Sequence, residues 1–249
     1  MKWRVTSCTV TGSAKSENED RTLVLEDKKR GLTLALLLDG HNGCDLVDYC
    51  MRRVPEIFWD EKENSPGNLI SILARETMPF TSGATISAVL LHANGIIEVA
   101  SLGDSPLVWG KCFQANPYLP LSYLPSHNID VNPKEAERVQ KLGAKIDGAY
   151  YRFGENSGHQ YTRGLGDQWA KDFLSREPEV GQDSLEPGGF VLLASDGFFT
   201  QGKPPEPLWT GWLPKVKTKE SASDILFHFA DQIRRKGDDA SLILCYLEE

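Results

Sequence analysis

Acidic residues stand at the ends of five apolar runs in this chain, and glycine adjoins four of them. These residues are Asp20, Asp39, Asp104, Asp196 and Asp238. If the runs are strands, each carboxylate lies at the rim of a sheet, where a neighbouring glycine lets the backbone turn tightly. Carboxylates that meet at one rim repel each other, and divalent cations remove that repulsion. Each pair of aspartate and glycine alone is also a common turn, but five acidic residues, each at the end of an apolar run, predict a metal site built on strand ends.

The apolar runs are short and are separated by turn residues, which predicts an α+β fold. We expect strands over 3–10, 22–26, 32–38, 84–92, 96–102, 106–109, 190–194 and 240–247, and helices over 44–59, 69–76, 133–142 and 221–235. Asn94 and Gly95 between two apolar runs are typical of a hairpin. Asn132 is the expected N-cap of the helix that Pro133 begins. Hairpins favour mostly antiparallel sheets with helices packed outside them.

The length of the chain indicates a single domain, and its charge disfavours some classes of binding protein. The 249 residues fit a single domain, and the 27 basic against 35 acidic residues give a net charge of −8. This balance disfavours nucleic-acid binding and membrane binding through a basic face. No apolar run approaches the roughly 20 residues of a membrane span, and the N-terminus lacks a signal-peptide pattern. We expect a cytoplasmic protein, since the five cysteines are odd in number and lack CxxC spacing. We also expect a monomer, since nothing in the sequence indicates a larger assembly.

Eight short motifs follow one another in a fixed order. They are SENEDRTLV, LLLDGHNG, SGATISAVLL, VASLGDSPLVW, LPSHN with KEAERVQKLGAKI, YTRGLGD, LLASDGFFT and GDDASLILCYL. Over residues 8–247 this succession resembles the metal-dependent protein phosphatases of the 2C type, and the compact length is similar to the bacterial members. The resemblance implies a four-layer αββα sandwich, in which two mostly antiparallel sheets are flanked by helices. It also implies a protein-serine/threonine phosphatase that acts on phosphoserine and phosphothreonine proteins.

The resemblance assigns metal ligands position by position. Asp39 matches the aspartate that bridges two metal ions, and Gly40 matches the position whose backbone carbonyl binds one of them. Asp196 and Asp238 match ligands of the other ion. Asp239 replaces the usual asparagine, so either carboxylate of this pair is a candidate ligand, and we favour Asp238. The donors are all oxygens, which favours Mg²⁺ or Mn²⁺.

Three more acidic residues are candidates around those ligands. Asp20 matches a residue that supports the site through metal-bound water, and Glu19 is similar to the carboxylate beside it. Asp104 is similar to an aspartate that joins a third, weaker metal in some members. Thr200 stands where that third site often has another acid. We therefore expect two ions, with the third left open.

The expected catalytic residues are His41 and Lys15. Two divalent ions lower the pKa of a bridging water and align it for direct attack on phosphorus. His41, within DGHNG, matches the general acid that protonates the leaving alkoxide. Lys15 stands where the family often has a phosphate-binding arginine, and because lysine lacks the bidentate fork, Arg21 is the alternative. We expect Arg163 to support the fold.

The other histidines, including His127, are expected to be structural, with a role near the site kept open for His127. Two other functions are alternatives to an active phosphatase. The departures at Lys15 and Thr200 permit a catalytically impaired pseudophosphatase that binds phosphoproteins. A metal-dependent nuclease is disfavoured by the acidic charge. A cognate serine/threonine kinase is left open as a partner.

We expect the stretch 144–188 to be irregular, because it follows no strict hydrophobic period, and it is long for a plain connection. In the resembling family a variable flap lies in this part of the chain. We expect 144–188 to be a mobile flap that shapes substrate choice, with the Tyr150-Tyr151 pair against peptide substrates and Trp169 nearby. The alternative is an ordered insertion packed on the sandwich.

Overall fold

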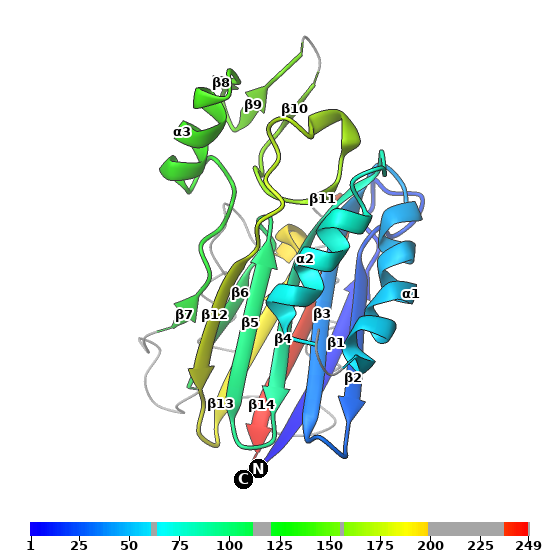
Figure 1. The fold of residues 1–249 in the computed structure, drawn as a ribbon, viewed down its shortest axis with the longest axis vertical. Coiled ribbons are helices and arrows are strands. Elements are labelled where there is room, and N and C mark those ends of the chain that lie inside the picture. The colour runs from blue at the N-terminus through cyan, green and yellow to red at the C-terminus, as the bar shows by residue number, and fades with distance from the viewer. Residues whose placement is uncertain (61–63, 112–120, 155–156, 199–236, 249) are drawn as a thin grey trace.

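Two antiparallel sheets lie face to face in the computed structural model, which describes residues 1–60, 64–111, 121–154, 157–198 and 237–248 (Figure 1). The first sheet has the strand order β1-β14-β13-β6-β7. Its strands are β1 (Lys2–Val10), β6 (Leu107–Lys111), β7 (Ser122–Tyr123), β13 (Gly189–Ala194) and β14 (Ala240–Glu248). Both described chain ends lie at one end of the sandwich (Figure 1).

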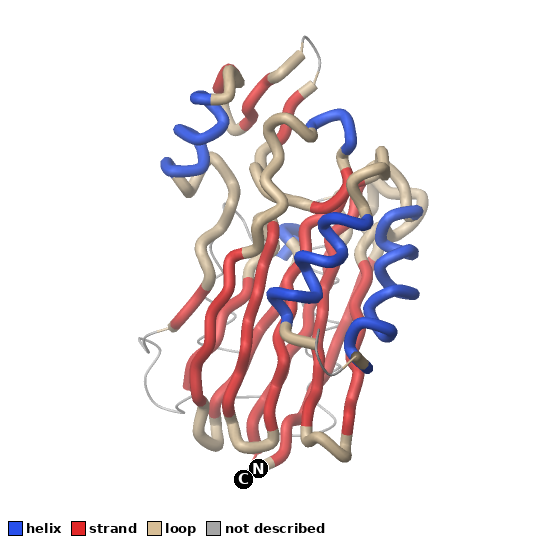
Figure 2. Tube along the Cα trace, in the orientation of Figure 1, coloured by secondary structure: helices blue, strands red, loops and turns tan. Residues whose placement is uncertain are grey.

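The second sheet has the order β12-β5-β4-β3-β2, and the short strand β11 also pairs with β4. Its strands are β2 (Arg21–Asp27), β3 (Leu32–His41), β4 (Gly83–His92), β5 (Ile96–Leu102), β11 (Leu165–Gly166) and β12 (Glu179–Ser184). Helices α1 (Asp45–Trp59) and α2 (Pro66–Glu76) cover its outer face (Figure 2). The α+β class and the antiparallel sandwich expected from the sequence are confirmed.

The apolar core forms two layers, one on each face of the second sheet. Along β3, Leu34, Leu36 and Leu38 pack with the helices, whereas Ala35 and Leu37 pack between the sheets. Successive side chains of a strand point to opposite faces. Because both faces of β3 are buried, the strand appears in the sequence as an uninterrupted apolar run.

Several element ends differ from expectation. Strand β3 does not stop before Asp39 but continues through His41, which pairs with Gly83 at the start of β4. Helix α2 begins at Pro66 because Ser65 caps it and accepts a hydrogen bond from the Asn68 backbone N–H at 3.3 Å.

Helix α3 (Pro133–Lys141) has the expected Asn132 at its N-cap position. The Asn132 side chain, however, donates to the Ser126 carbonyl at 2.8 Å. It therefore fastens the preceding loop rather than the helix.

The prediction that 144–188 is irregular was wrong for much of its length. It contains the short strands β8 (Lys145–Asp147), β9 (Tyr150–Arg152) and β10 (Gly158–His159), which form a three-stranded sheet beside α3. β11 and β12 within the same stretch belong to the sandwich. Strand β12 was missed because its sequence EVGQDS is mostly polar, as suits an edge strand with several exposed side chains.

Tyr151 also departs from expectation, because it is fully buried with Val139 of α3 and Phe153. It is therefore a core residue of the small sheet and does not face a substrate. Tyr150 and Trp169 are 40% and 44% exposed. The flap role of this region stays a prediction for these two side chains.

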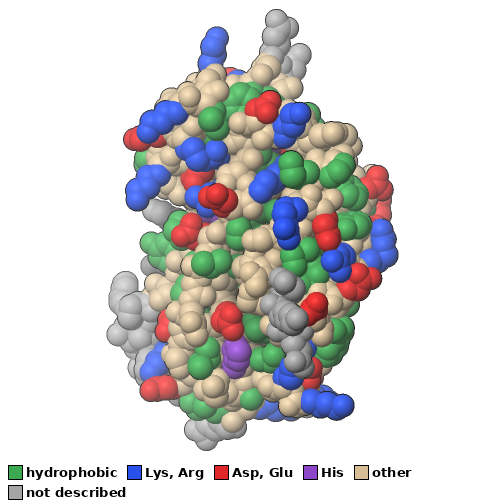
Figure 3. Space-filling model, viewed as in Figure 1, with side chains coloured by type: hydrophobic (Ala, Val, Ile, Leu, Met, Phe, Trp, Pro, Cys, Tyr) green, Lys and Arg blue, Asp and Glu red, His purple; other side chains and the backbone are tan. Residues whose placement is uncertain are grey.

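The predicted helix 221–235 and Thr200 lie outside the described residues. The four cysteines at described positions, Cys8, Cys44, Cys50 and Cys245, are free thiols. Among the described residues, no helix combines the length and the apolar character that crossing a membrane requires. Basic and acidic side chains are interspersed on the face that carries α1 and α2 (Figure 3).

Candidate active site

The register of the two sheets brings the five predicted aspartates to one end of the sandwich. Asp39 lies in β3 near its end, and Asp104 and Asp196 follow β5 and β13. Asp20 and Asp238 precede β2 and β14. The antiparallel pairings place all of these strand ends at the end opposite the described termini (Figure 1). The strand-end pattern in the sequence therefore corresponds to a shared rim.

Asp39 joins the two sheets at this rim. The backbone N–H of Asp196 donates to Asp39 Oδ2 at 3.3 Å. Burial, together with the charges of Asp196, Asp20 and Asp104, raises the pKa of Asp39 well above its usual value. A Cβ at the next residue, Gly40, would lie 2.5 Å from the Glu19 carbonyl oxygen, so only glycine allows this close approach of two chain segments.

Asp20 is buried at the rim and is 3% exposed. Within the described part of the chain neither carboxylate oxygen makes a hydrogen bond of ordinary geometry, although the side chains of Ser241 and Ser195 are near enough to oppose the rise of its pKa. Burial and the charges of Asp239 and Asp238 raise the pKa of Asp20 to about 7. A buried carboxylate without partners is costly unless a cation compensates it.

Asp196 and Asp104 lie among the same acidic residues, although Asp196 is exposed at the surface and Asp104 is buried. Desolvation of the Asp196 carboxylate by its neighbours, with the charges of Asp104 and Asp238, raises its pKa to about 7. Burial raises the pKa of Asp104, although its Oδ2 accepts a hydrogen bond from Asn128 Nδ2 at 2.8 Å. The sequence assigned no role to Asn128, which lies in the LPSHN motif. Orphaned carboxylate oxygens and an all-oxygen donor set fit Mg²⁺ or Mn²⁺ at this rim.

The adjacent residues Asp238 and Asp239 have different environments. Asp239 is 2% exposed, and its two carboxylate oxygens accept the backbone N–H groups of Gly12 and Glu19, each at 2.8 Å. Asp238 is half-exposed, and its Oδ1 lies 3.6 Å from Lys15 Nζ. Asp239 therefore fastens the loop before β2, which supports Asp238 as the ligand. The assignment stays a prediction.

Lys15 does not extend freely from the rim. Its Nζ donates to Glu19 Oε2 at 2.7 Å, and Glu19 Oε1 accepts the Gly43 backbone N–H at 2.6 Å. Partial burial opposes ionisation of Lys15, but the hydrogen bond and the charge of Glu19 outweigh it and raise the pKa of Lys15. The alternative, Arg21, donates through Nε to Asp48 Oδ1 at 2.9 Å and through Nη1 to the Asn18 carbonyl, so its described contacts are with α1 and the neighbouring loop.

His127 and Arg163 have structural contacts. His127 is 1% exposed, and its Nδ1 accepts the Gly103 backbone N–H at 3.0 Å, which fastens the turn before Asp104. Burial, with the charge of Arg163, lowers the pKa of His127 to about 4. Arg163 donates through Nε and Nη2 to Glu135 Oε1 at 3.0 and 2.7 Å. His127 therefore supports the turn at the rim, and Arg163 ties its loop to α3, which is a structural contact of the kind the sequence predicted for it.

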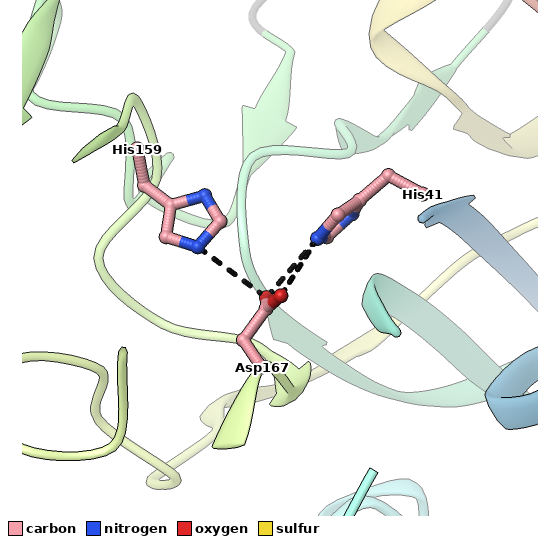
Figure 4. Close-up of side chains that lie close together, drawn as sticks. All are labelled: His41, His159 and Asp167. Atoms are coloured by element: carbon pink, nitrogen blue, oxygen red, sulfur yellow. Dashed lines mark hydrogen bonds and ion pairs between the residues drawn. The ribbon is translucent and has the colours of Figure 1, made fainter. Parts of the chain in front are cut away.

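His41 belongs to a cluster that the sequence did not predict. Its Nε2 lies 3.0 and 3.1 Å from the two carboxylate oxygens of Asp167 (Figure 4). Tyr161 Oη donates to Asp167 Oδ2 at 2.7 Å and lies 2.9 Å from His41 Nε2. Burial opposes the ionised form of Asp167, but the contact with His41 outweighs it and lowers the pKa of Asp167. Asp167 ends the YTRGLGD motif, which was the one available signal.

The sequence of this chain is similar to those of known phosphatases. The family model described as "Protein phosphatase 2C" matches residues 12–201, about three quarters of the chain. The chain is 27% identical over 187 residues to "Protein phosphatase 2C homolog 2" of Schizosaccharomyces pombe, a match that covers 66% of this chain and 48% of that protein. The chain thus spans about half the length of this curated relative.

Solved structures share the whole fold. The "serine-threonine phosphatase 2C from Toxoplasma gondii" superposes with a TM-score of 0.72 and 16% identity over 99% of this chain and 95% of the other. RsbX, solved "in complex with magnesium", superposes with a TM-score of 0.60 and 13% identity over 99% and 96%. At these identities the likeness shows the fold.

Proposed function

The chain belongs to the protein phosphatase 2C family, and on that premise we propose that it is a protein-serine/threonine phosphatase that requires bound Mg²⁺ or Mn²⁺. The observation that carries the proposal is the crowded carboxylate rim, where the pKa values of Asp20 and Asp196 are both raised to about 7. A bound divalent cation relieves this repulsion at neutral pH, where the carboxylates would otherwise have to keep protons.

We assign the metal ligands to Asp39, the Gly40 carbonyl, Asp196 and Asp238, with Asp20 behind them and Asp104 as the additional candidate. Bound divalent ions would activate water and offset the charge that develops on the phosphoryl oxygens. No Cys or His nucleophile is required, so direct hydrolysis of the phosphate monoester fits this donor set.

His41 is the proposed general acid for the leaving serine or threonine alkoxide. The alkoxide is a strong base, so a positioned proton donor contributes about 10²–10⁴-fold. Asp167 fixes the orientation of the His41 ring through the contacts at 3.0 and 3.1 Å. In this proposal Asp167 is a positioning residue, because it acts through His41.

A pseudophosphatase that binds phosphoproteins is the second candidate. One observation favours it: the cation proposed to receive phosphate, Lys15, is already paired with Glu19 at 2.7 Å. The retained acidic residues at the rim favour the enzyme, because a binding module has no need for carboxylates that destabilise one another.

The experiment is hydrolysis of a phosphothreonine peptide in EDTA, Mg²⁺ and Mn²⁺. We expect turnover only with a divalent ion, and its loss in Asp39→Asn. The matched control is Asp27→Asn, at the opposite end of β2 from the rim, which should keep wild-type activity. Peptide binding without hydrolysis in every metal would support the pseudophosphatase instead.

A further inference from the structure

Three segments that are distant in the sequence bring two histidines and an aspartate together beside the rim. His41 ends β3, His159 lies in β10, and Asp167 follows β11 (Figure 4). His159 Nε2 lies 3.6 Å from Asp167 Oδ2, and His41 Nε2 lies 3.0 Å from Asp167 Oδ1. In the described part of the chain this is the one group of three potential ligand atoms that all lie within 4.8 Å of one another.

We propose that His41, His159 and Asp167 form a second metal site, separate from the carboxylate rim, which takes a borderline divalent cation such as Zn²⁺ and thereby inhibits the enzyme. The metal site itself depends only on these three side chains. The inhibition rests on the proposed function, because it follows from capture of the proposed general acid.

The donor set selects the class of metal. Imidazole nitrogens suit Zn²⁺ and its transition-metal neighbours, whereas Mg²⁺ prefers oxygen. Zinc bonds of about 2.0–2.1 Å in a tetrahedron place neighbouring ligand atoms about 3.3 Å apart. The two ligand separations to Asp167, 3.0 and 3.6 Å, bracket that value. Tyr161 Oη, 2.9 Å from His41 Nε2, adds a polar atom beside the cluster.

His159 supplies an independent observation. It is 8% exposed, and within the described residues its Nε2 has no hydrogen-bond partner, although it points toward Asp167 (Figure 4). Its ring stacks on Trp169 with centroids 4.6 Å apart, which fixes its orientation. A neutral imidazole can present the lone pair of this nitrogen to a cation placed between it and Asp167. A buried imidazole nitrogen that faces a carboxylate without a hydrogen bond is typical of a ligand position.

The backbone is shaped to hold the cluster. A Cβ at Gly83, which pairs with His41, would lie 2.2 Å from Asp167 Oδ2 and 2.5 Å from His41 Cε1. Asp167 itself has the left-handed φ of 48°, and its N–H donates to the Ser82 carbonyl at 3.1 Å. Ligands held by strand ends and backbone hydrogen bonds are preorganised for one geometry.

The consequence for activity is specific. When His41 Nε2 binds a metal, the ring can no longer take up the second proton that makes it an imidazolium acid. Hydrolysis of alkyl phosphate monoesters then slows, whereas aryl esters with good leaving groups are less affected. The cation would be reached from the His41 side, since His41 is 26% exposed and Asp167 is fully buried.

The test is a Zn²⁺ titration of the full chain against a chromophoric chelator, in millimolar Mg²⁺. We expect one tight Zn²⁺ equivalent in the wild type. His159→Gln should weaken it by more than the roughly 10–100-fold that loss of an outer-shell partner costs. His159→Cys, which restores a zinc ligand, should recover tight binding. His92→Gln, at the far end of β4, is the matched control and should bind as the wild type does.

Two outcomes overturn the proposal. If folded His159→Gln, judged by circular dichroism, binds Zn²⁺ as tightly as the wild type, the cluster is not the site. If Asp39→Asn abolishes the tight equivalent, the zinc occupies the carboxylate rim. Both measurements are independent of turnover, so an inactive protein would leave the metal site testable. Inhibition by Zn²⁺ of phosphothreonine hydrolysis that persists in His159→Gln would refute the regulatory part alone.

Discussion

Asp20→Asn should stabilise the metal-free protein at neutral pH, although most substitutions at buried sites destabilise. The folded pKa of Asp20 is about 7 and its ordinary value is 3.8. Each pKa unit corresponds to about 1.4 kcal/mol, so ionised Asp20 destabilises the fold by up to about 4 kcal/mol at pH 7 and above. Asparagine keeps the shape of the side chain and carries no charge.

The pH dependence follows from the same values. Between pH 3.8 and about 7 the folded state holds a proton on Asp20 that the unfolded state has released. Stability therefore falls as pH rises through this window. From about pH 5 to pH 7, Asp20 alone should account for a decrease of roughly 2–3 kcal/mol in the free energy of unfolding. The variant should lack this decrease.

The assay is urea unfolding in EDTA at about pH 5 and pH 7.5, for wild type and Asp20→Asn. Asp147→Asn, at an exposed position of β8, is the matched control and should follow the wild type. Saturating Mn²⁺ should reduce the advantage of Asp20→Asn, because bound cations stabilise the wild-type rim. Parallel pH curves for wild type and Asp20→Asn in EDTA would refute the reasoning.

Three further predictions concern His41, Glu135 and Tyr150, which lie outside the metal ligands proposed for the rim. His41→Ala should slow phosphothreonine hydrolysis by about 10²–10⁴-fold and p-nitrophenyl phosphate hydrolysis much less, because nitrophenolate leaves without a proton; equal losses would exclude the leaving-group role. Glu135→Gln should reduce stability by about 3–5 kcal/mol in urea unfolding at pH 7. Burial opposes ionisation of Glu135, but its hydrogen bonds with Arg163 and Arg138 outweigh it and lower the pKa of Glu135 to about 2. The stability that ionised Glu135 contributes is therefore lost as pH falls from 4.5 toward 2. If Glu135→Gln destabilises the protein as much at pH 2 as at pH 7, the prediction is wrong. Tyr150→Ala should raise KM for phosphopeptides and leave thermal stability unchanged, and unchanged kinetics on both peptide and aryl substrates would remove Tyr150 from the substrate surface.

The sandwich was predictable because its strands are apolar runs between turn residues. The residues from Leu34 to Leu38 are buried on both faces of the sheet, so the strand is visible in the sequence as an uninterrupted apolar run. Strand β12 was not predictable, because an edge strand with exposed side chains does not need an apolar pattern. Tyr151 was misplaced for a related reason: an aromatic pair in a polar stretch does not reveal which ring turns inward.

The rim was partly predictable, since strand-end aspartates are local signals that an antiparallel register then brings together. The choice between Asp238 and Asp239 required the backbone donors of Gly12 and Glu19, which are more than 200 residues away in the sequence. Asp167 lies in the YTRGLGD motif, but neither it nor His159 carries a local sign of contact with His41, because that contact exists only in three dimensions. A contact between residues that are distant in the sequence leaves no mark on the hydrophobic periodicity of either segment.

The most direct test of the account is a crystal structure of the protein grown in Mn²⁺, with anomalous diffraction recorded at the manganese edge. We predict anomalous peaks at the carboxylate rim, within about 2.0–2.3 Å of oxygens of Asp39, Asp196 and Asp238, as expected for oxygen ligands of small divalent ions. Saturating Mn²⁺ with no peak near these three carboxylates would contradict the central claim that the rim is a divalent-metal site.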